Sequence, residues 1–175
     1  FEDGATVHPG LLVRALRRRA IAAGVSVHER TPALRARDGE VTTPEGVLRA
    51  PEVVLATNAF LSGWKPASRS LTNFGSYVVL TEPVPELLEE IGWTGGEAIV
   101  DGRMFIHYFR TTEDGRVLMG SGSGPIGLGG RVDGRFTQDV ATGARAELGL
   151  RRLLPGLAEA RIERAWGGPI DVTSS

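Results

Sequence analysis

The 175-residue sequence predicts a mixed α/β fold, with an incomplete open α/β half followed by a domain built on an antiparallel sheet with flanking helices. Two observations predict the first part. An amphipathic helix is expected over 9–23, and the apolar segment 53–56 runs into small residues, as strands do at the carboxyl edge of an α/β sheet. A third observation predicts the second part, because short strand-like segments separated by turn residues follow one another after Trp64.

The first third of the chain carries clear local signals. The helix over 9–23 has apolar residues at near-helical spacing, with Pro9 in its first turn and Gly24 as its C-cap. Asp38-Gly39 is a hairpin turn signal. Alternating or apolar residues around these signals predict strands at 25–29, 33–37, 41–43, 47–49 and 53–56.

The remaining chain predicts a sheet with two helices. Pro83 and Pro85 end the first strand, and Asp114-Gly115 supplies a turn. We expect strands at 74–81, 98–101, 104–110, 116–120 and 161–167, and helices at 86–91 and 137–154. The expected organisation is a first domain over 1–64, a second over 65–165, and a return segment over 166–175.

The composition excludes several classes of function. With 41% hydrophobic and 23% charged residues the chain is an ordinary globular sequence, and its net charge of -1 gives no footprint for nucleic acid. No apolar run approaches the roughly 20 residues of a membrane span. Cysteine is absent, which is compatible with a reducing compartment, so we expect a cytoplasmic location. Because the chain begins with Phe1 rather than Met, we expect a fragment or a processed form of a longer protein.

Glycines at 122, 124 and 127 match the spacing G-x-G-x-x-G. A dinucleotide fingerprint requires a helix directly after this motif, so that free backbone N–H groups meet the phosphates. The sequence that follows, 128–134, does not start a helix. We therefore predict a flexible loop here, and no dinucleotide fingerprint.

No set of side chains in the sequence forms a self-contained catalytic group. His8, His28 and His107 lack metal-ligand spacing, and no serine has the G-x-S-x-G context of a nucleophile. If the chain belongs to an enzyme, a cofactor carries its chemistry.

Tyr108 and Arg110 are two residues apart in an expected strand, so their side chains lie on the same face. Two interpretations stay open. The pair could orient a polar substrate in a cleft, or the tyrosine could be half in the core with the arginine reaching out at the sheet rim.

Several segments in the same order resemble the D-amino-acid oxidase superfamily, the FAD-dependent group that includes glycine oxidase and sarcosine oxidase. Together they span most of the chain. They are Thr6-Val7-His8-Pro9, Val53–Ala59, Thr81-Glu82-Pro83, Asp114–Gly120 and Trp166-Gly167-Gly168. The resemblance implies that the first domain is the central part of a Rossmann-like FAD-binding domain and that the second is the substrate domain.

The resemblance also implies roles for particular residues. Positions implied to approach FAD are Ala33 near the adenine, Ala56, Thr57 and Asn58 beside the pyrophosphate and ribityl chain, and Trp166 and Gly167 near the active site. Tyr108 and Arg110 would lie in the substrate sheet. Ile170 stands where relatives that oxidise free amino acids carry an arginine, and an apolar side chain cannot clamp a carboxylate. A small amine, or an amino acid held by Arg110, is therefore the expected substrate.

The implied reaction is oxidation of a C–N bond by hydride transfer to the flavin, with O2 or another acceptor reoxidising it. The chain lacks the N-terminal fingerprint and the C-terminal flavin segment of this family, so we expect it to be inactive on its own. The alternative is a complete, non-catalytic module that binds a ligand or partner on its antiparallel sheet. Against it, 53–56 is apolar on both faces and would need neighbouring strands on both sides.

Overall fold

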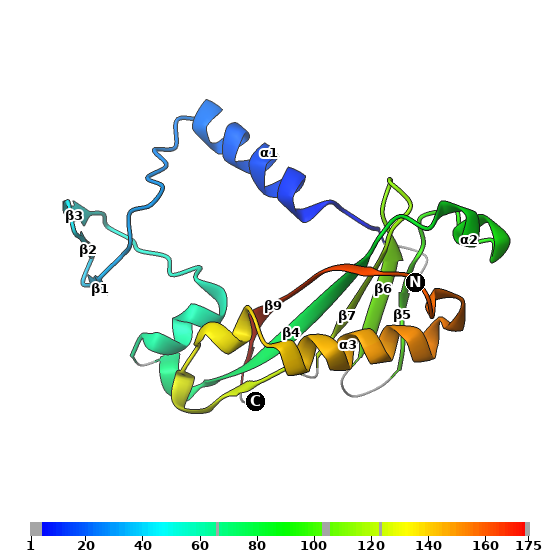
Figure 1. Cartoon of the computed structure of the whole chain (residues 1–175). Coiled ribbons are helices and arrows are strands. Elements are labelled where there is room, and N and C mark those ends of the chain that lie inside the picture. The colour runs from blue at the N-terminus through cyan, green and yellow to red at the C-terminus, as the bar shows by residue number, and fades with distance from the viewer. Residues whose placement is uncertain (1–4, 66, 103–105, 123, 174–175) are drawn as a thin grey trace. The chain divides into compact units, whose positions relative to one another are not determined.

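A computed structural model describes residues 5–65, 67–102, 106–122 and 124–173 (Figure 1). The chain divides into two compact units, one over Val7–Ala56 and a larger one that comprises Phe1–Thr6 and Thr57–Ser175. The division falls inside the segment 56–58, ahead of residue 64. A mixed α/β fold with antiparallel sheets is confirmed.

The smaller unit starts with helix α1 (Pro9–Ala22). Its N-cap is His8, whose Nδ1 accepts a hydrogen bond from the Leu11 amide at 3.3 Å. Pro9 occupies the first turn as expected, since the missing N–H has no intrahelical partner there. None of the residues of α1 is buried, so local capping rather than core packing defines this helix.

An antiparallel meander completes the smaller unit. It consists of β1 (Arg35–Arg37), β2 (Glu40–Thr43) and β3 (Gly46–Arg49). The turn between the first two strands has Asp38 at φ 49° and Gly39 at φ 77°, the two positive values that a type I′ hairpin requires. The predicted hairpin and third strand are confirmed.

Two strands predicted for this part of the chain are wrong. Residues 25–28 and 52–56 have no strand partner among the described residues, and Val54 is 87% exposed. An apolar or alternating run becomes a strand only when a neighbour completes its ladder of hydrogen bonds. The three strands of the meander pair only with each other, so neither run has such a neighbour.

The larger unit is built on an antiparallel sheet in which β4 is central. Strand order runs β5-β6-β7-β4, with β8 pairing β4 beyond the end of β7, while β9 pairs the other edge of β4. The strands are β4 (Leu71–Thr81), β5 (Ala98–Val100), β6 (His107–Thr111), β7 (Val117–Ser121), β8 (Ile126–Gly127) and β9 (Ile162–Thr173). The expected strand over 104–110 is present from His107, and residues 104–105 lie outside the described residues.

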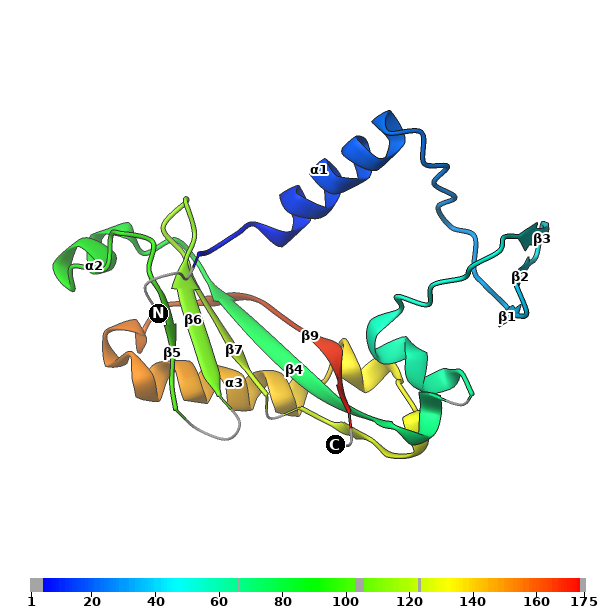
Figure 2. The same cartoon turned by 180° about the vertical axis from the view of Figure 1, so that it is seen from behind.

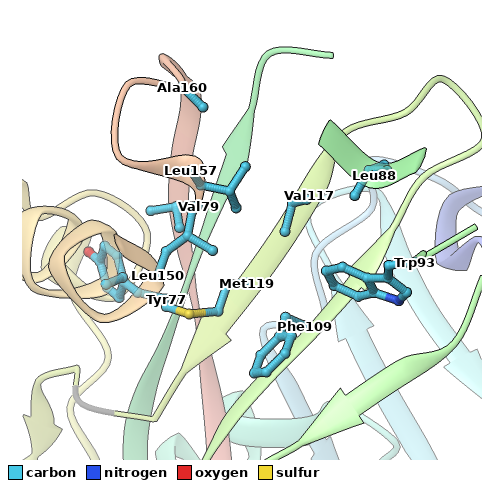
Figure 3. Close-up of a cluster of buried hydrophobic side chains, with 11 residues drawn as sticks. Tyr77, Val79, Leu88, Trp93, Phe109, Val117, Met119, Leu150, Leu157 and Ala160 are labelled. Atoms are coloured by element: carbon cyan, nitrogen blue, oxygen red, sulfur yellow. The ribbon is translucent and has the colours of Figure 1, made fainter. Parts of the chain in front are cut away.

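Helix α3 (Val140–Leu153) covers one face of this sheet (Figure 1). Its N-cap Asp139 accepts from the Thr142 amide at 3.2 Å. The core lies between helix and sheet, and Figure 3 shows Met119 there among aromatic and aliphatic side chains. The short helix α2 (Pro85–Glu90) adds Leu88 to this core.

The opposite face of the sheet is not covered by any helix of the described part of this unit (Figure 2). Along β4, odd-numbered residues from Asn73 to Thr81 are buried, and even-numbered residues are only half-buried. Because neighbouring residues of a strand point to opposite faces, the even-numbered set marks the open face.

The glycine motif at 122–127 does not open an α-helix. Ile126–Gly127 pairs β4 as β8, and the 3-10 turn Leu128–Gly130 follows. The prediction that this motif is not a dinucleotide fingerprint agrees with this geometry. The prediction of an unpaired flexible loop is wrong for Ile126 and Gly127, because the edge of β4 is free beyond the end of β7 and accepts them.

Candidate active site on the open face of the sheet

One row of paired residues crosses the open face from β6 to β9. The strand registers place Tyr108 opposite Gly120, Gly120 opposite Val78, and Val78 opposite Trp166. Directly paired residues share a face. Tyr108 and Trp166, which are far apart in the sequence, thus face the same side of the sheet at roughly 14 Å, three strand spacings apart.

Tyr108 is held in a fixed orientation. Its ring lies over Gly120, because a Cβ at that position would come within 2.0 Å of the ring atom Cζ. Its hydroxyl is 2.9 Å from the Ser76 Oγ on β4. A ring that lies on a glycine and ends in a hydrogen bond presents its hydroxyl at one place, which is what a substrate-orienting group needs.

An apolar strip follows β9 on the same face. Trp166 is 39% and Ile170 is 44% exposed, and both lie on the open face with Gly168 between them. No atom lies within 4 Å of where a Gly168 side chain would start. The strip therefore offers a flat apolar surface with accessible backbone at its centre.

Arginines lie at both ends of the adjacent row. Arg110 on β6 pairs across Leu118 and Leu80 to Arg164 on β9, so both cations share the face of Tyr108. Within the described ranges, the guanidinium of Arg110 has neither a hydrogen-bond nor an ion-pair partner. An unpaired guanidinium beside the tyrosine could bind a carboxylate or another polar group.

Gly167 lies on the covered face instead. A side chain there would clash with the Phe136 carbonyl oxygen and with the Tyr77 ring, each 2.4 Å from the position of its Cβ. Its amide donates to the Thr137 carbonyl at 2.9 Å. Gly167 thus allows β9 to lie close against Tyr77, and it does not face the strip.

The expected cofactor residues fall into both units. Thr57 and Asn58 belong to the larger unit, at the start of the 3-10 turn η1 (Asn58–Gly63), which packs against β4 and β9. Ala33 and Ala56 belong to the smaller unit, and both are exposed. The structure therefore groups Thr57, Asn58 and Trp166 in one unit.

Two titratable side chains, His107 and Tyr77, lie on the covered face. His107 Nδ1 lies 2.8 Å from Asp101 Oδ2, with side chains only 14% and 17% exposed. Burial, followed by the charge of Asp139, raises the pKa of Tyr77.

Among the described residues no group of three or more histidine, cysteine or acidic side chains could hold a metal. Within the same residues, no helix is long and apolar enough to cross a membrane.

Sequence reasoning missed two residues of the open face. Ser76 and Arg164 join it through the pairing of β4 with β7 and β9, and neither carries a motif. Alternation along β4 gives the face of Ser76, but its contact with Tyr108 depends on a register that the sequence does not contain.

A helix and meander followed by a sheet with one uncovered face agree with the class of flavin-dependent oxidoreductases that the motifs resemble. The chain belongs to the DAO family of FAD-dependent oxidoreductases, which it matches over residues 1–175. This family match does not favour the alternative of a non-catalytic binding module.

Other proteins are similar to this chain in sequence or in fold. The chain is 30% identical over 177 residues to the probable oxidoreductase OrdL of Rhizobium meliloti (strain 1021), covering 95% of this chain and 38% of that protein. It shares its fold with L-proline dehydrogenase from P. horikoshii (TM-score 0.72, 18% identity, 95% and 44% coverage of the two chains). Glycine oxidase from Geobacillus kaustophilus is also similar (TM-score 0.68, 22% identity, 93% and 42% coverage). The chain therefore spans less than half the length of these relatives.

Proposed function

We propose that this chain is the central part of an FAD-dependent enzyme that oxidises a C–N bond of a small amine. The observation that carries the proposal is the row from Tyr108 to Trp166 across an uncovered sheet face, in a chain of the FAD-dependent oxidoreductase family. Val7–Ala56 would be part of the FAD-binding domain, and the sheet would be the substrate domain. A cytoplasmic location belongs to the same proposal.

The residues present fit a flat cofactor. Trp166 and the open backbone at Gly168 provide an apolar surface for a ring system, and the exposed Thr57 and Asn58 suit the polar chain of FAD. Ala33 and Ala56 are proposed to contribute backbone contacts from the smaller unit. Gly167 is proposed to act through its neighbour Trp166, because the missing side chain lets β9 lie close against Tyr77. When bound, FAD supplies the hydride acceptor for the C–H bond next to nitrogen.

The remaining residues of the face are proposed to bind substrate. The hydroxyl of Tyr108, fixed by Ser76, would orient the polar end of the amine. Ile170 would pack against the apolar part of the substrate. Arg110, two residues from Tyr108, would hold a carboxylate where the substrate carries one. No side chain need act as a base, because the neutral amine loses a hydride rather than a proton from carbon.

The substrate class can be tested on the full-length protein that contains this chain. We would compare kcat/KM for amines with that for the matching α-amino acids. The wild-type protein is expected to prefer the amines, and Ile170→Arg should shift the ratio toward the amino acids by about tenfold or more.

Val172→Arg is the matched control for this experiment. It adds the same charge to the same face of β9, next to the site rather than in it. It should leave the ratio unchanged. A wild-type preference for amino acids, or equal shifts in both variants, would contradict the proposed role of Ile170.

A further inference from the structure

A fully buried asparagine ties together three segments at one end of the sheet. Asn73, near the start of β4, is 0% exposed. Its Nδ2 donates to the Ser62 Oγ at 2.7 Å and to the Ala59 carbonyl at 3.2 Å. Both partners belong to η1, so the amide joins that turn to the central strand.

Ser62 extends this connection to a third segment. Its Oγ lies 2.8 Å from the Ala59 carbonyl oxygen and 2.9 Å from that of Gly130. A hydroxyl has one proton, so it donates to one carbonyl at a time while it accepts from Asn73. The approach of Gly130 is close, because a Cβ there would lie 2.7 Å from the Ser62 carbonyl oxygen, and its φ is 74°.

The fixed turn starts with a residue in an uncommon conformation. Asn58 has φ 50°, and its Oδ1 accepts from the Ala59 amide at 2.6 Å. Ala59 is fully buried, and its carbonyl is the one that Asn73 holds. Asparagine adopts the left-handed region more readily than other residues with a side chain, and the hydrogen bonds to Ala59 and Ser62 hold the turn that directly follows Asn58.

Stability alone does not explain an asparagine at this place. Within the part of the chain that the structure describes, Asn73 Oδ1 is buried and has no hydrogen-bond partner. An unpaired buried acceptor weakens a fold. What the amide provides is the pair of donors that hold Ala59 and Ser62.

We propose that Asn73 and Ser62 are positioning residues that fix Thr57 and Asn58 for contact with the cofactor. They do not themselves touch FAD, because both are buried. This inference rests on the proposed function, which takes the segment 56–58 as a cofactor contact. It adds to that function a device on the substrate sheet which sets the geometry of the cofactor segment.

The test uses the full-length protein and the variants Asn73→Ala, Ser62→Ala and Thr81→Ala. Thr81 is the matched control, because it is also fully buried on β4 and donates to the Glu82 carbonyl, at the strand's other end. We would measure the Kd for FAD, the absorption spectrum of the bound flavin and the thermal unfolding temperature.

The expected result separates positioning from stability. Asn73→Ala and Thr81→Ala should both lower the unfolding temperature, but only Asn73→Ala and Ser62→Ala should raise the Kd for FAD, by about tenfold, and shift the flavin spectrum. If Asn73→Ala does not fold, Ser62→Ala decides. Wild-type Kd and spectrum in a folded variant, or an equal change in Thr81→Ala, overturns the inference alone. Absence of FAD binding by the wild-type protein overturns the proposed function together with it.

Discussion

The two compact units differ in how each is stabilised internally. In the larger unit, side chains such as Val79, Val117 and Met119 are completely buried between the sheet and α3. In the smaller unit, no described residue is buried, and Leu11, Val13 and Leu16 of α1 are more than half exposed. The larger unit has a core of its own, whereas caps and turns define the smaller one.

This difference shows what each unit needs. A sheet packed on a helix carries its own hydrophobic stabilisation. An amphipathic helix with an exposed apolar face does not, since most helical stability in proteins comes from packing of that face. We therefore expect the smaller unit to gain its packing in the longer protein.

The largest expected effect comes from the core of the larger unit. Met119→Ala removes a fully buried side chain and should lower the free energy of unfolding by about 2–5 kcal/mol. Leu16→Ala on α1 is the matched truncation in the smaller unit and should change it by less than about 0.5 kcal/mol in this chain. Urea unfolding measures both. Equal losses would show that the smaller unit has a core after all.

Two neighbouring glycines on β9 allow the covered and the open face of the sheet to be compared. Gly167→Ala places a methyl group against Tyr77 and the Phe136 carbonyl and should cost about 1–3 kcal/mol. Gly168→Ala faces open space and should be nearly neutral in urea unfolding. A larger loss from Gly168→Ala would mean that the open face is packed in solution.

A smaller effect is expected in the meander. Gly39 has φ 77°, and a Cβ there would lie 2.7 Å from the Ala50 carbonyl oxygen, so Gly39→Ala should destabilise this turn by about 1 kcal/mol. Because Ala50 donates to the Gly39 carbonyl, hydrogen exchange at the Ala50 amide should accelerate. Exchange in β4 should not change. Acceleration in both places would show that the units unfold together.

The smallest effect is the pH dependence of the larger unit. The Thr142 hydroxyl, then backbone N–H groups at the start of α3 and the charge of Arg145, lower the pKa of Asp139. A carboxyl with a lowered folded-state pKa stabilises the fold above its unfolded value, and this stability is lost as pH falls through the folded value. The urea concentration at the unfolding midpoint should therefore decrease as the pH is lowered below about 4, and this decrease should be smaller in Asp139→Asn. Identical profiles would remove Asp139 from this account.

Local signals predicted most elements of the fold. Asp38-Gly39 predicted its hairpin, Pro9 predicted the start of α1, and the strand-like run 74–81, ended by Pro83 and Pro85, predicted β4. The strand predictions for residues 25–29 and 53–56 were wrong because a sequence pattern indicates which face a side chain would occupy, and not whether a partner strand exists. The sequence of either segment alone could not show that this partner is missing.

The candidate site was predictable only in part. Tyr108 and Arg110 could be placed on one face from alternation within their own strand. Their alignment with Trp166, and the contact of Tyr108 with Ser76, depend on pairing between strands distant in sequence. The position of the Tyr108 ring likewise depends on Gly120, because the ring lies where a side chain of that residue would start. This contact exists only when β6 and β7 are paired, so the sequence alone does not indicate it.

The visible absorption spectrum tests the central claim most directly. It would be recorded on this chain and on the product of the longest reading frame that contains it. We expect flavin bands in the long protein that bleach when an amine substrate is added without oxygen, and little or no flavin in the short chain. A long protein that is folded and turns over an amine without bound flavin would contradict the account.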